Sequence, residues 1–504
     1  MNIEELKYQI LQQFGFPPTP EQAQALDVFV QFMTDSNPHA VMILRGSAGT
    51  GKTSLSGAIV RTLRAVRQKV MLLAPTGRAA KVFSLNSGMP AYTIHRRIYR
   101  EKAFAGVDGQ FNLNDNLYTD TLFMVDEASM IANLGLGGTT FGSGCLLDDL
   151  IHFVYQGRND RLLLIGDKAQ LPPVGEEESP ALSAAMLQGY GLSVYECDLN
   201  EVVRQSQQSG ILFNATRIRQ MITHDDITQL PKIRFSGFSD IREMPGAELI
   251  EALGDSYHQV GLDDTIVVTR SNKRANIFNQ GIRNMVLDRE EELESGDMLM
   301  IVKNNYYWME EERKKIKERQ LSEERKVKSE KFNTLANHTV QSNELPAFLA
   351  NGDRAKVMKV SRRIELYGFH FATLLLKFPD YDNYELEATV LLDTLTSEAP
   401  ALTHDQQEQL FHKIEEDYQD IPLKADRMKA IRQDPYFNAL QVKFAYAVTC
   451  HKAQGGQWSH VYVDQGYMTD DMLTPDYIHW LYTAFTRATE MLYLVNWPKT
   501  QVEG

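Results

Sequence analysis

Short apolar runs alternate with helical patterns between residues 40 and 200 of the chain. Each run is continuous rather than alternating, which is typical of strands buried on both faces of a parallel sheet. The helical segments between the runs are typical of crossover connections. The four runs are residues 40–44, 69–75, 121–127 and 161–167. The pattern therefore predicts a parallel α/β lobe with loops at the carboxyl ends of its strands.

A second set of apolar runs follows later in the chain. It begins at residues 265–271 and resumes at 444–455, 460–464 and 490–496. These runs have the same character as the first set, so they predict a second α/β lobe. The predicted fold class is α/β with two parallel-sheet lobes.

The interval between the two parts of the second lobe has a different pattern. Residues 310–331 mix Glu with Lys and Arg, as a solvated helix does, and a nucleic-acid contact is the alternative interpretation. Three strand-like runs at 351–360, 369–378 and 384–392 have antiparallel spacing and predict a small β-barrel. Residues 402–435 then read as helix.

These patterns predict five parts of the chain. They are a first lobe (1–95 and 122–250), a β-hairpin insert (96–121), a second lobe (251–305 and 437–504), a charged helical insert (306–350) and a β-barrel with a helical insert (351–436).

Composition narrows the class of protein. The 504 residues carry a formal net charge of −14, which argues against nucleic acid over the whole surface but leaves room for a confined basic channel. The 3 cysteines have no metal-binding spacing and fit a reducing compartment. No apolar run is long enough for a membrane span, so we expect a cytoplasmic protein with no membrane partner.

The firmest chemical signal is "GSAGTGKTS" at residues 46–54, directly after the first apolar run. It has the spacing Gly-x-x-x-x-Gly-Lys-Thr, in which backbone N–H groups and the start of a helix bind phosphates. Lys52 offsets the charge of the β- and γ-phosphates, and the hydroxyl of Thr53 is a ligand for Mg²⁺. The motif predicts a nucleotide site for ATP and Mg²⁺.

An acidic pair ends the third run of the first lobe. Asp126 and Glu127 close "FMVDEAS", at the same edge of the predicted sheet as the phosphate loop. Asp126 is expected to hold Mg²⁺ through water, and Glu127 to orient and deprotonate the water that attacks the γ-phosphate. The pair favours ATP hydrolysis over phosphoryl transfer to another substrate.

Further motifs extend the pattern over most of the chain. They are "PTPEQAQAL" (18–26), "APTGRAAKVF" (74–83), "TIHRRI" (93–98), "LLLIGDKAQLPPVG" (162–175), "NEVVRQ" (200–205), "VTCHKAQG" (448–455) and "LYTAFTRATE" (481–490). In this order they resemble the superfamily 1 DNA helicases of the 5′-to-3′ branch, the RecD- and Dda-like group. The resemblance implies two RecA-like lobes, an SH3-like barrel in the second lobe, and a small hairpin, the pin, in the first.

The resemblance also implies roles at the nucleotide. Gln22 would read adenine, Gln170 would sense the γ-phosphate, and Arg204 and Arg487 would reach the γ-phosphate. The implied catalytic residues are Lys52, Asp126, Glu127, Gln170, Arg204 and Arg487, with Thr53 and Asp126 at the metal. The implied nucleotide-binding residues are Gln22, Gly46, Ser47, Ala48, Gly49, Thr50, Gly51, Lys52, Thr53, Ser54 and Gly455.

A third set of residues is implied to contact DNA. Hydroxyl, imidazole and cationic side chains hold phosphates without reading sequence. The implied contacts are Thr76, Arg78 and His95 in the first lobe and Thr449, His451 and Lys452 in the second. Phe104 and Phe111 flank the turn-forming pair Asp108-Gly109 and are candidates for stacking on the last base pair, although an ordinary surface hairpin would show the same pattern.

The resemblance implies a helicase that moves 5′ to 3′ on single-stranded DNA, acts at duplex junctions and serves replication, recombination or repair. Single-strand-binding or recombination proteins are the partners it implies. One alternative is a RecD-like subunit that works only inside a multi-subunit helicase–nuclease complex. Another alternative is an RNA helicase or ribonucleoprotein remodeller of the same superfamily.

Overall fold

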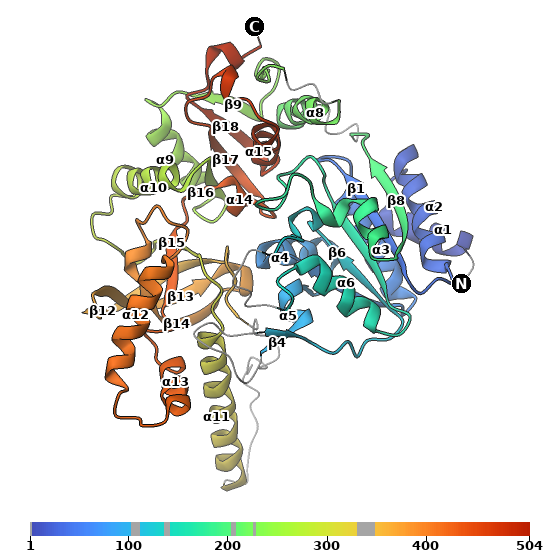
Figure 1. Ribbon diagram of the computed structural model, residues 1–504. Helices are drawn as coiled ribbons and strands as arrows, with labels where there is room; N and C mark the ends of the chain where they lie inside the picture. Colours follow the sequence, from blue (N-terminus) through green and yellow to red (C-terminus); the bar gives the residue numbers. More distant parts are fainter. Residues whose placement is uncertain are drawn as a thin grey trace. The chain divides into compact units, whose positions relative to one another are not determined.

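The computed structural model describes residues 3–101, 111–135, 142–202, 208–224, 228–329 and 348–503 (Figure 1). The chain forms two compact units. One unit contains residues 1–288 and 446–504, and the other contains residues 289–445.

The first unit contains a parallel sheet of six strands in the order β3-β2-β6-β7-β1-β8. Its strands are β1 (Ala40–Gly46), β2 (Lys69–Ala74), β3 (Ala91–Thr93), β6 (Thr121–Val125), β7 (Arg161–Gly166) and β8 (Ser193–Leu199). The four predicted strands are present and lie next to one another. The edge strands β3 and β8 lack a continuous apolar run because each is buried less completely than the strands between them.

Helices cover this sheet and complete the first lobe. They are α1 (Ile3–Phe14), α2 (Pro20–Thr34), α3 (Lys52–Ala65), α4 (Gly77–Ser87), α5 (Ile94–Ile98), α6 (Leu146–Gln156) and α7 (Ala184–Gly189), with short 3₁₀ turns at Ala128–Met130 and Pro180–Leu182. Helix α2 packs on β1 and β8, and α1 packs on α2 and α3 (Figure 1). Phe29, Ile59 and Met42 lie in the resulting apolar core, which holds β1 and the loop after it in place.

The predicted hairpin begins as an antiparallel pair. Strand β4 (Tyr99–Glu101) pairs with β5 (Phe111–Leu113), with Tyr99 opposite Leu113. Phe111 lies in β5, whereas Phe104 falls outside the described residues. The stacking role of both phenylalanines stays a prediction.

The first unit also contains a second parallel sheet, in the order β16-β10-β17-β18-β9. Its strands are β9 (Ile241–Met244), β10 (Thr265–Thr269), β16 (Ala447–Thr449), β17 (Trp458–Asp464) and β18 (Ala488–Val495). Its helices are α8 (Gly210–Thr223), α9 (Leu249–Gln259), α10 (Asn272–Gly281) with a π-helical turn at Ile282–Val286, α14 (Cys450–Ala453) and α15 (Pro475–Phe485).

The boundary predicted at residue 250 is therefore too late. Strand β9 pairs with β18, and α8 lies along α15, so the second lobe includes residues from Gly210 onward (Figure 1). The sequence pattern missed β9 because it is an edge strand whose two middle residues, Arg242 and Glu243, are exposed.

The second unit is a closed barrel in the order β11-β12-β13-β14-β15. Its strands are β11 (Met298–Ile301), β12 (Arg354–Leu366), β13 (Phe369–Phe378), β14 (Tyr384–Leu391) and β15 (Leu440–Phe444). The predicted barrel is present, but the assignment of 298–301 and 440–444 to the second lobe is wrong. These two strands pair with each other and close the barrel, which the three predicted strands alone leave open.

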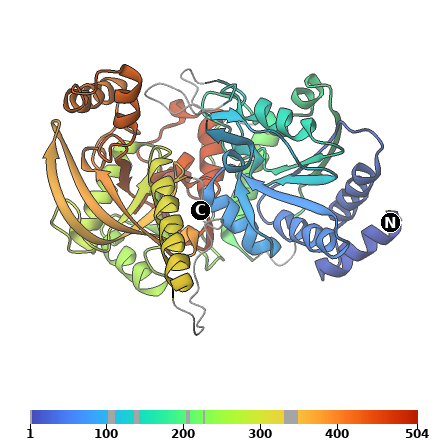
Figure 2. The same cartoon turned by 90° about the horizontal axis from the view of Figure 1, so that it is seen from below.

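Three helices accompany the barrel: α11 (Tyr307–Ser329), α12 (His404–Asp417) and α13 (Lys424–Arg432). The charged segment predicted as helix is α11. Helices α12 and α13 bury Leu410, Ile414 and Ile431 against Phe369 and Phe371 of β13. The long pair β12 and β13 forms an extended hairpin, drawn in orange in Figure 2. Across the described residues, no helix combines the length and apolar character needed to cross a membrane.

Candidate nucleotide and DNA sites

The phosphate-binding loop connects β1 to α3, as predicted. Gly49 and Gly51 have φ angles of 77° and 81°, the left-handed region that favours glycine. A Cβ on Gly46 would lie 2.7 Å from Cγ of Lys52, so the loop also needs a glycine at its start. Strand, loop and helix therefore have the geometry by which backbone N–H groups bind phosphates.

Gln22 supports this loop from α2. Its side chain is 2% exposed, and its Nε2 donates a hydrogen bond to the carbonyl of Thr50 at 2.9 Å. Its Oε1 accepts from the backbone N–H of Thr19, which forms a capping box with Gln22 at the start of α2. Gln22 thus positions the loop, and its contact with adenine stays a prediction.

Lys52 and Thr53 begin α3. The ammonium group of Lys52 donates to the carbonyl oxygens of Gly46 and, at 3.3 Å, Ser47, so it lies over the loop. Thr53 and Ser54 are exposed at the first turn of the helix. An exposed hydroxyl at this position fits a ligand for a metal ion that also contacts phosphates.

The acidic pair follows β6 at the same edge of the sheet. The N–H of Glu127 donates to Oδ1 of Asp126 at 2.9 Å, and Glu127 has a φ of 53°. A non-glycine residue in this region stores backbone strain, which is common at active sites. Burial and the neighbouring charge of Glu127 raise the pKa of Asp126 to about 7, while Lys52 opposes this shift.

The donor set fits Mg²⁺ better than a metal held by protein alone. Within the described part of the chain, no three His, Cys, Asp or Glu side chains gather as metal ligands. Mg²⁺ is commonly bound through one or two protein groups, waters and the substrate phosphates. Thr53 and Asp126 suit this mode because Thr53 lies in the first turn of α3, directly after the loop with phosphate-binding geometry, and Asp126 lies near Lys52.

Gln170 lies in the loop after β7, beside β1 in the sheet. It is 6% exposed, and among the described residues its Oε1 has no hydrogen-bond partner. A buried amide without a partner is costly, which makes it a candidate for binding a ligand. Its role as a γ-phosphate sensor stays a prediction.

Of the two arginines predicted to reach the γ-phosphate, the structure describes Arg487. Arg487 is 2% exposed, and its guanidinium donates to the carbonyls of Thr483 and Gly456, both at 3.0 Å, and to Oγ1 of Thr486 at 3.2 Å. Each nitrogen of this guanidinium is therefore bonded once within the second lobe, and Nη1 and Nη2 each carry a second N–H that can serve another acceptor. Arg204 lies outside the described residues.

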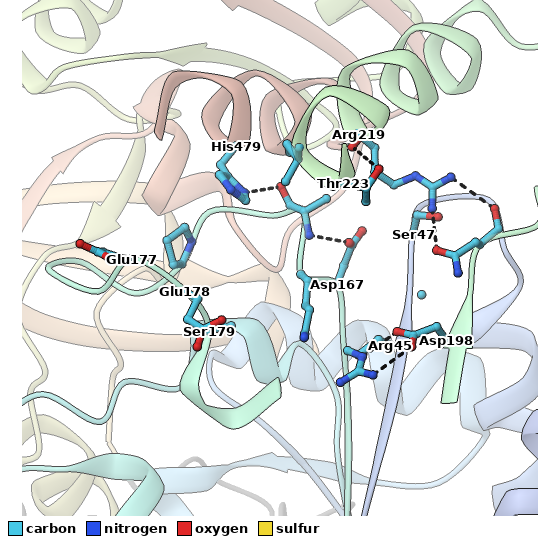
Figure 3. A pocket seen from close by; sticks show the side chains of 16 residues that line it. Arg45, Ser47, Asp167, Glu177, Glu178, Ser179, Asp198, Arg219, Thr223 and His479 are labelled. Carbon is cyan, nitrogen blue, oxygen red and sulfur yellow. Dashed lines mark hydrogen bonds and ion pairs between the residues drawn. The ribbon is translucent and has the colours of Figure 1, made fainter. Parts of the chain in front are cut away.

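Arg219 of α8 is a candidate that the sequence reasoning missed. It lines a cavity of about 330 Å³ together with Ser47 and Asp167. Figure 3 shows its side chain extending from α8 toward the strand end that carries Ser47. Its Nη1 donates to Oδ1 of Asn200 at 3.0 Å, but among the described residues its Nε and the Oγ of Ser47 have no partner. No motif marks Arg219, because only the packing of α8 on α15 brings it to this cavity.

The cavity also contains a fixed ion pair. Arg45 on β1 bonds Asp198 on β8 at 2.6 Å (Figure 3). It also bonds Glu196, on the same strand, at 2.7 Å. These contacts raise the pKa of Arg45, chiefly through the hydrogen bond to Asp198. Arg45 therefore stays charged and occupied by protein carboxylates.

Two predicted DNA contacts of the first lobe, Thr76 and Arg78, lie against residues 455–458 of the second lobe. Nη2 of Arg78 donates to the carbonyl of Gln457 at 2.6 Å, and its guanidinium lies 4.2 Å from the ring centroid of Trp458. Thr76 caps α4, and a Cβ on Gly455 would lie 3.2 Å from its Oγ1. Gly455, assigned to the nucleotide from sequence, thus lies beside the predicted DNA contact Thr76.

His95 sits at the base of the hairpin. Its ring centroid lies 5.6 Å from that of Tyr99, whose hydroxyl donates to Asp149 at 2.6 Å. Burial lowers the pKa of His95 to about 4, against an opposing effect of Asp149. The imidazole is therefore neutral at pH 7 in this environment.

The remaining predicted DNA contacts lie at the carboxyl end of β16. Thr449 directly precedes α14, without a side-chain capping bond, and His451 is exposed on the helix. Partial desolvation lowers the pKa of His451, opposed by Asp476. Lys452 follows on the same short helix, so these three groups occupy one edge of the second sheet.

Two family models match the chain. The model described as an AAA domain matches residues 18–230, and the model described as a UvrD-like helicase C-terminal domain matches residues 444–495. The first match contains the phosphate loop, the acidic pair and Gln170. The second contains β16, β17 and α15.

Curated relatives match over parts of their length. The ATP-dependent RecD2 DNA helicase of Deinococcus radiodurans is 30% identical over 193 residues, 38% of this chain and 22% of the relative. The ATP-dependent DNA helicase dda of Enterobacteria phage T4 is 23% identical over 300 residues, 56% of this chain and 60% of the relative. This chain therefore covers less than two thirds of either relative.

Among solved structures, the Pif1 helicase from Bacteroides in complex with ADP-AlF3 and ssDNA aligns with a TM-score of 0.43 and 13% sequence identity. The alignment covers 97% of this chain and 95% of that one.

Proposed function

We propose that this chain, a superfamily 1 helicase by its AAA and UvrD-like C-terminal matches, is an ATP-dependent DNA helicase that moves 5′ to 3′ on single-stranded DNA. The observation that carries the proposal is that one compact unit contains both the phosphate-loop site and the contact between the two lobes. The phosphate loop and acidic pair lie at one edge of the first sheet, and Thr76 and Arg78 of the first lobe meet residues 455–458 of the second.

The residues of the first site suit hydrolysis. Lys52 and the loop N–H groups bind the phosphates, and Glu127 orients and deprotonates the attacking water. When bound, Mg²⁺ neutralises charge that develops on the phosphates, and Thr53 and Asp126 are the groups that would hold it. The second lobe supplies Arg219 and the second N–H groups on Nη1 and Nη2 of Arg487.

The residues of the second site suit single-stranded nucleic acid. Arg78, Thr76 and Lys452 offer a guanidinium, a hydroxyl and an ammonium to phosphates, contacts that do not depend on base sequence. Because these groups come from both lobes, a movement between the lobes changes the spacing of the strand contacts. This change in spacing is how ATP hydrolysis would move the chain along the strand.

Direction is tested with duplexes that carry either a 5′ or a 3′ single-stranded tail. With ATP, we expect the purified chain to unwind only the 5′-tailed duplex. Unwinding only from a 3′ tail would contradict the proposed direction. A chain that hydrolyses ATP but unwinds nothing without added subunits would favour the RecD-like subunit, and stronger stimulation of ATPase by RNA than by DNA would favour the RNA remodeller.

DNA affinity should fall with salt although the chain is acidic. Neutralising two phosphates, by Arg78 and Lys452, predicts a loss of about seven-fold between 0.05 and 0.2 M salt, because the slope for single strands is about −0.7 per phosphate. Fluorescence anisotropy of a labelled oligonucleotide measures this loss. Arg78→Ala should flatten the slope, whereas Arg64→Ala, a change at an exposed arginine near the end of α3, should not. A flat response of the unmodified chain would contradict the proposed contacts.

A further inference from the structure

The loop after β7 is held by the second lobe from several directions. It comprises residues 167–171 and includes Gln170. Its contacts are the Tyr482 hydroxyl to Asp167 at 2.5 Å, His479 Nδ1 to the carbonyl of Ala169 at 2.9 Å, the N–H of Leu171 to Thr483 Oγ1 at 2.8 Å, and Gln454 Nε2 to the carbonyl of Leu171 at 2.8 Å. Three of the second-lobe residues are on α15, so movement of this helix acts directly on the loop.

Tyr482 differs from the other three because it reaches a second element of the site. Its hydroxyl accepts a hydrogen bond from the backbone N–H of Ala48, in the phosphate loop, at 3.0 Å. The side chain is 1% exposed, and Asp167 is 4% exposed. One buried hydroxyl therefore connects α15, the phosphate loop and the loop that carries Gln170.

The chemistry of this hydroxyl matches both contacts. Burial, followed by the nearby charge of Asp167, raises the pKa of Tyr482 well above its ordinary value. The phenol is therefore neutral and can donate to a carboxylate and accept from an N–H at the same time. A phenylalanine would fill the same space, so packing alone does not account for a tyrosine here.

The contact with Ala48 has a consequence for nucleotide binding. Backbone N–H groups of this loop are the groups that cradle phosphates. An N–H that donates to the phenol has to redirect that hydrogen bond in order to serve a phosphate oxygen. Tyr482 of the second lobe and a bound phosphate thus need the same donor, the N–H of Ala48.

Resting on the proposed function, we propose that Tyr482 is the positioning residue through which the second lobe responds to phosphates on the loop, because its hydroxyl and a phosphate compete for the N–H of Ala48. Phosphate binding exchanges the bond from Ala48, weakens the tie between α15 and the loop, and leaves the hydroxyl bonded to Asp167. Release of phosphate restores the tie.

The test is Tyr482→Phe, which removes the hydroxyl and keeps the buried ring. A matched control is Tyr477→Phe on the same helix: Tyr477 is 2% exposed, and its hydroxyl donates to Gln465 inside the second lobe. Affinity for a fluorescent ATP analogue, basal ATPase, ATPase with single-stranded DNA and the thermal midpoint are measured for each. We expect Tyr482→Phe to bind nucleotide more tightly and to lose stimulation by DNA, each on the order of ten-fold, the size expected for a hydrogen bond near a charged group.

The outcomes separate this inference from the proposed function. If the unmodified chain lacks DNA-stimulated ATPase, the proposed function fails, while the nucleotide affinities of the two variants still test Tyr482. If Tyr482→Phe matches Tyr477→Phe in affinity and stimulation, or only lowers the thermal midpoint, the inference is overturned.

Asp167→Asn provides a second route if Tyr482→Phe does not fold. Asparagine has the size of aspartate but is a weaker acceptor for the phenol hydroxyl. We therefore expect a smaller gain in nucleotide affinity and a smaller loss of stimulation by DNA than in Tyr482→Phe. In the double variant the two effects should not add, because both act through the hydroxyl of Tyr482. Additive effects, or no effect of Asp167→Asn alone, would overturn the inference.

Discussion

Lys52→Ala should abolish ATP hydrolysis, with a loss in kcat of at least about 10²-fold, while single-stranded DNA binding largely persists. The ammonium of Lys52 lies over the loop, bonded to the carbonyl oxygens of Gly46 and Ser47, where it offsets phosphate charge. The residues proposed to contact DNA are on other elements, α4 and α14. Steady-state ATPase with saturating oligonucleotide, and anisotropy without nucleotide, measure the two effects.

A matched control tests whether the loss of ATPase comes from the position of Lys52 or from the removal of any positive charge. Lys69→Ala removes an exposed lysine at the amino end of β2, where its Nζ bonds Thr119. The phosphate loop lies at the carboxyl ends of the strands of the same sheet. We expect this variant to keep ATPase within about two-fold, as is usual for surface changes. Turnover near that of the unmodified chain in Lys52→Ala would show that this loop does not drive hydrolysis.

Local motifs made the strand–loop–helix geometry at residues 40–65 predictable. The loop at 46–54 needs only a strand before it, glycines within it and a helix after it, and all of this information is contiguous in the chain. The acidic pair was predictable for the same reason, because a buried strand delivers Asp126 and Glu127 to a sheet edge. The confirmed parts of the fold, two parallel sheets and a barrel, likewise follow from the periodicity of single segments.

What failed depends on contacts between distant segments. The apolar run at 298–301 reads as a buried strand in either sheet, and only its pairing with residues 440–444 assigns it to the barrel. Strand β9 is short and half exposed, so no run marks it. Arg219 lies in no quoted motif, and Tyr482 lies in the motif at 481–490 but received no role from it. Both become candidates only when α8 and α15 pack beside the phosphate loop.

Arg487→Ala should lower kcat by about 10³-fold or more, with a much smaller change in nucleotide affinity, if the guanidinium acts on charge that spreads over the transferred phosphoryl group. The side chain also bonds two carbonyls and a hydroxyl in the second lobe. Its removal takes the donor from the carbonyl of Gly456, at a cost of about 1–3 kcal/mol, whereas the hydroxyl of Thr486 still donates to the carbonyl of Thr483. The kinetic and structural effects therefore need separate measurements.

Two further variants make this separation. Arg487→Lys keeps the charge and can satisfy one carbonyl but lacks the planar fork, so we expect partial recovery of the thermal midpoint and little recovery of kcat. Arg283→Ala removes another arginine of the second lobe that is 2% exposed, and it reports the cost of losing a buried guanidinium remote from the loops. A kcat within ten-fold of the unmodified chain in Arg487→Ala, with a midpoint shift like that of Arg283→Ala, would contradict the catalytic role. The three hydrogen bonds in the present structure would then describe the whole function of Arg487, and Arg219, already beside the phosphate loop, would be the arginine to test next.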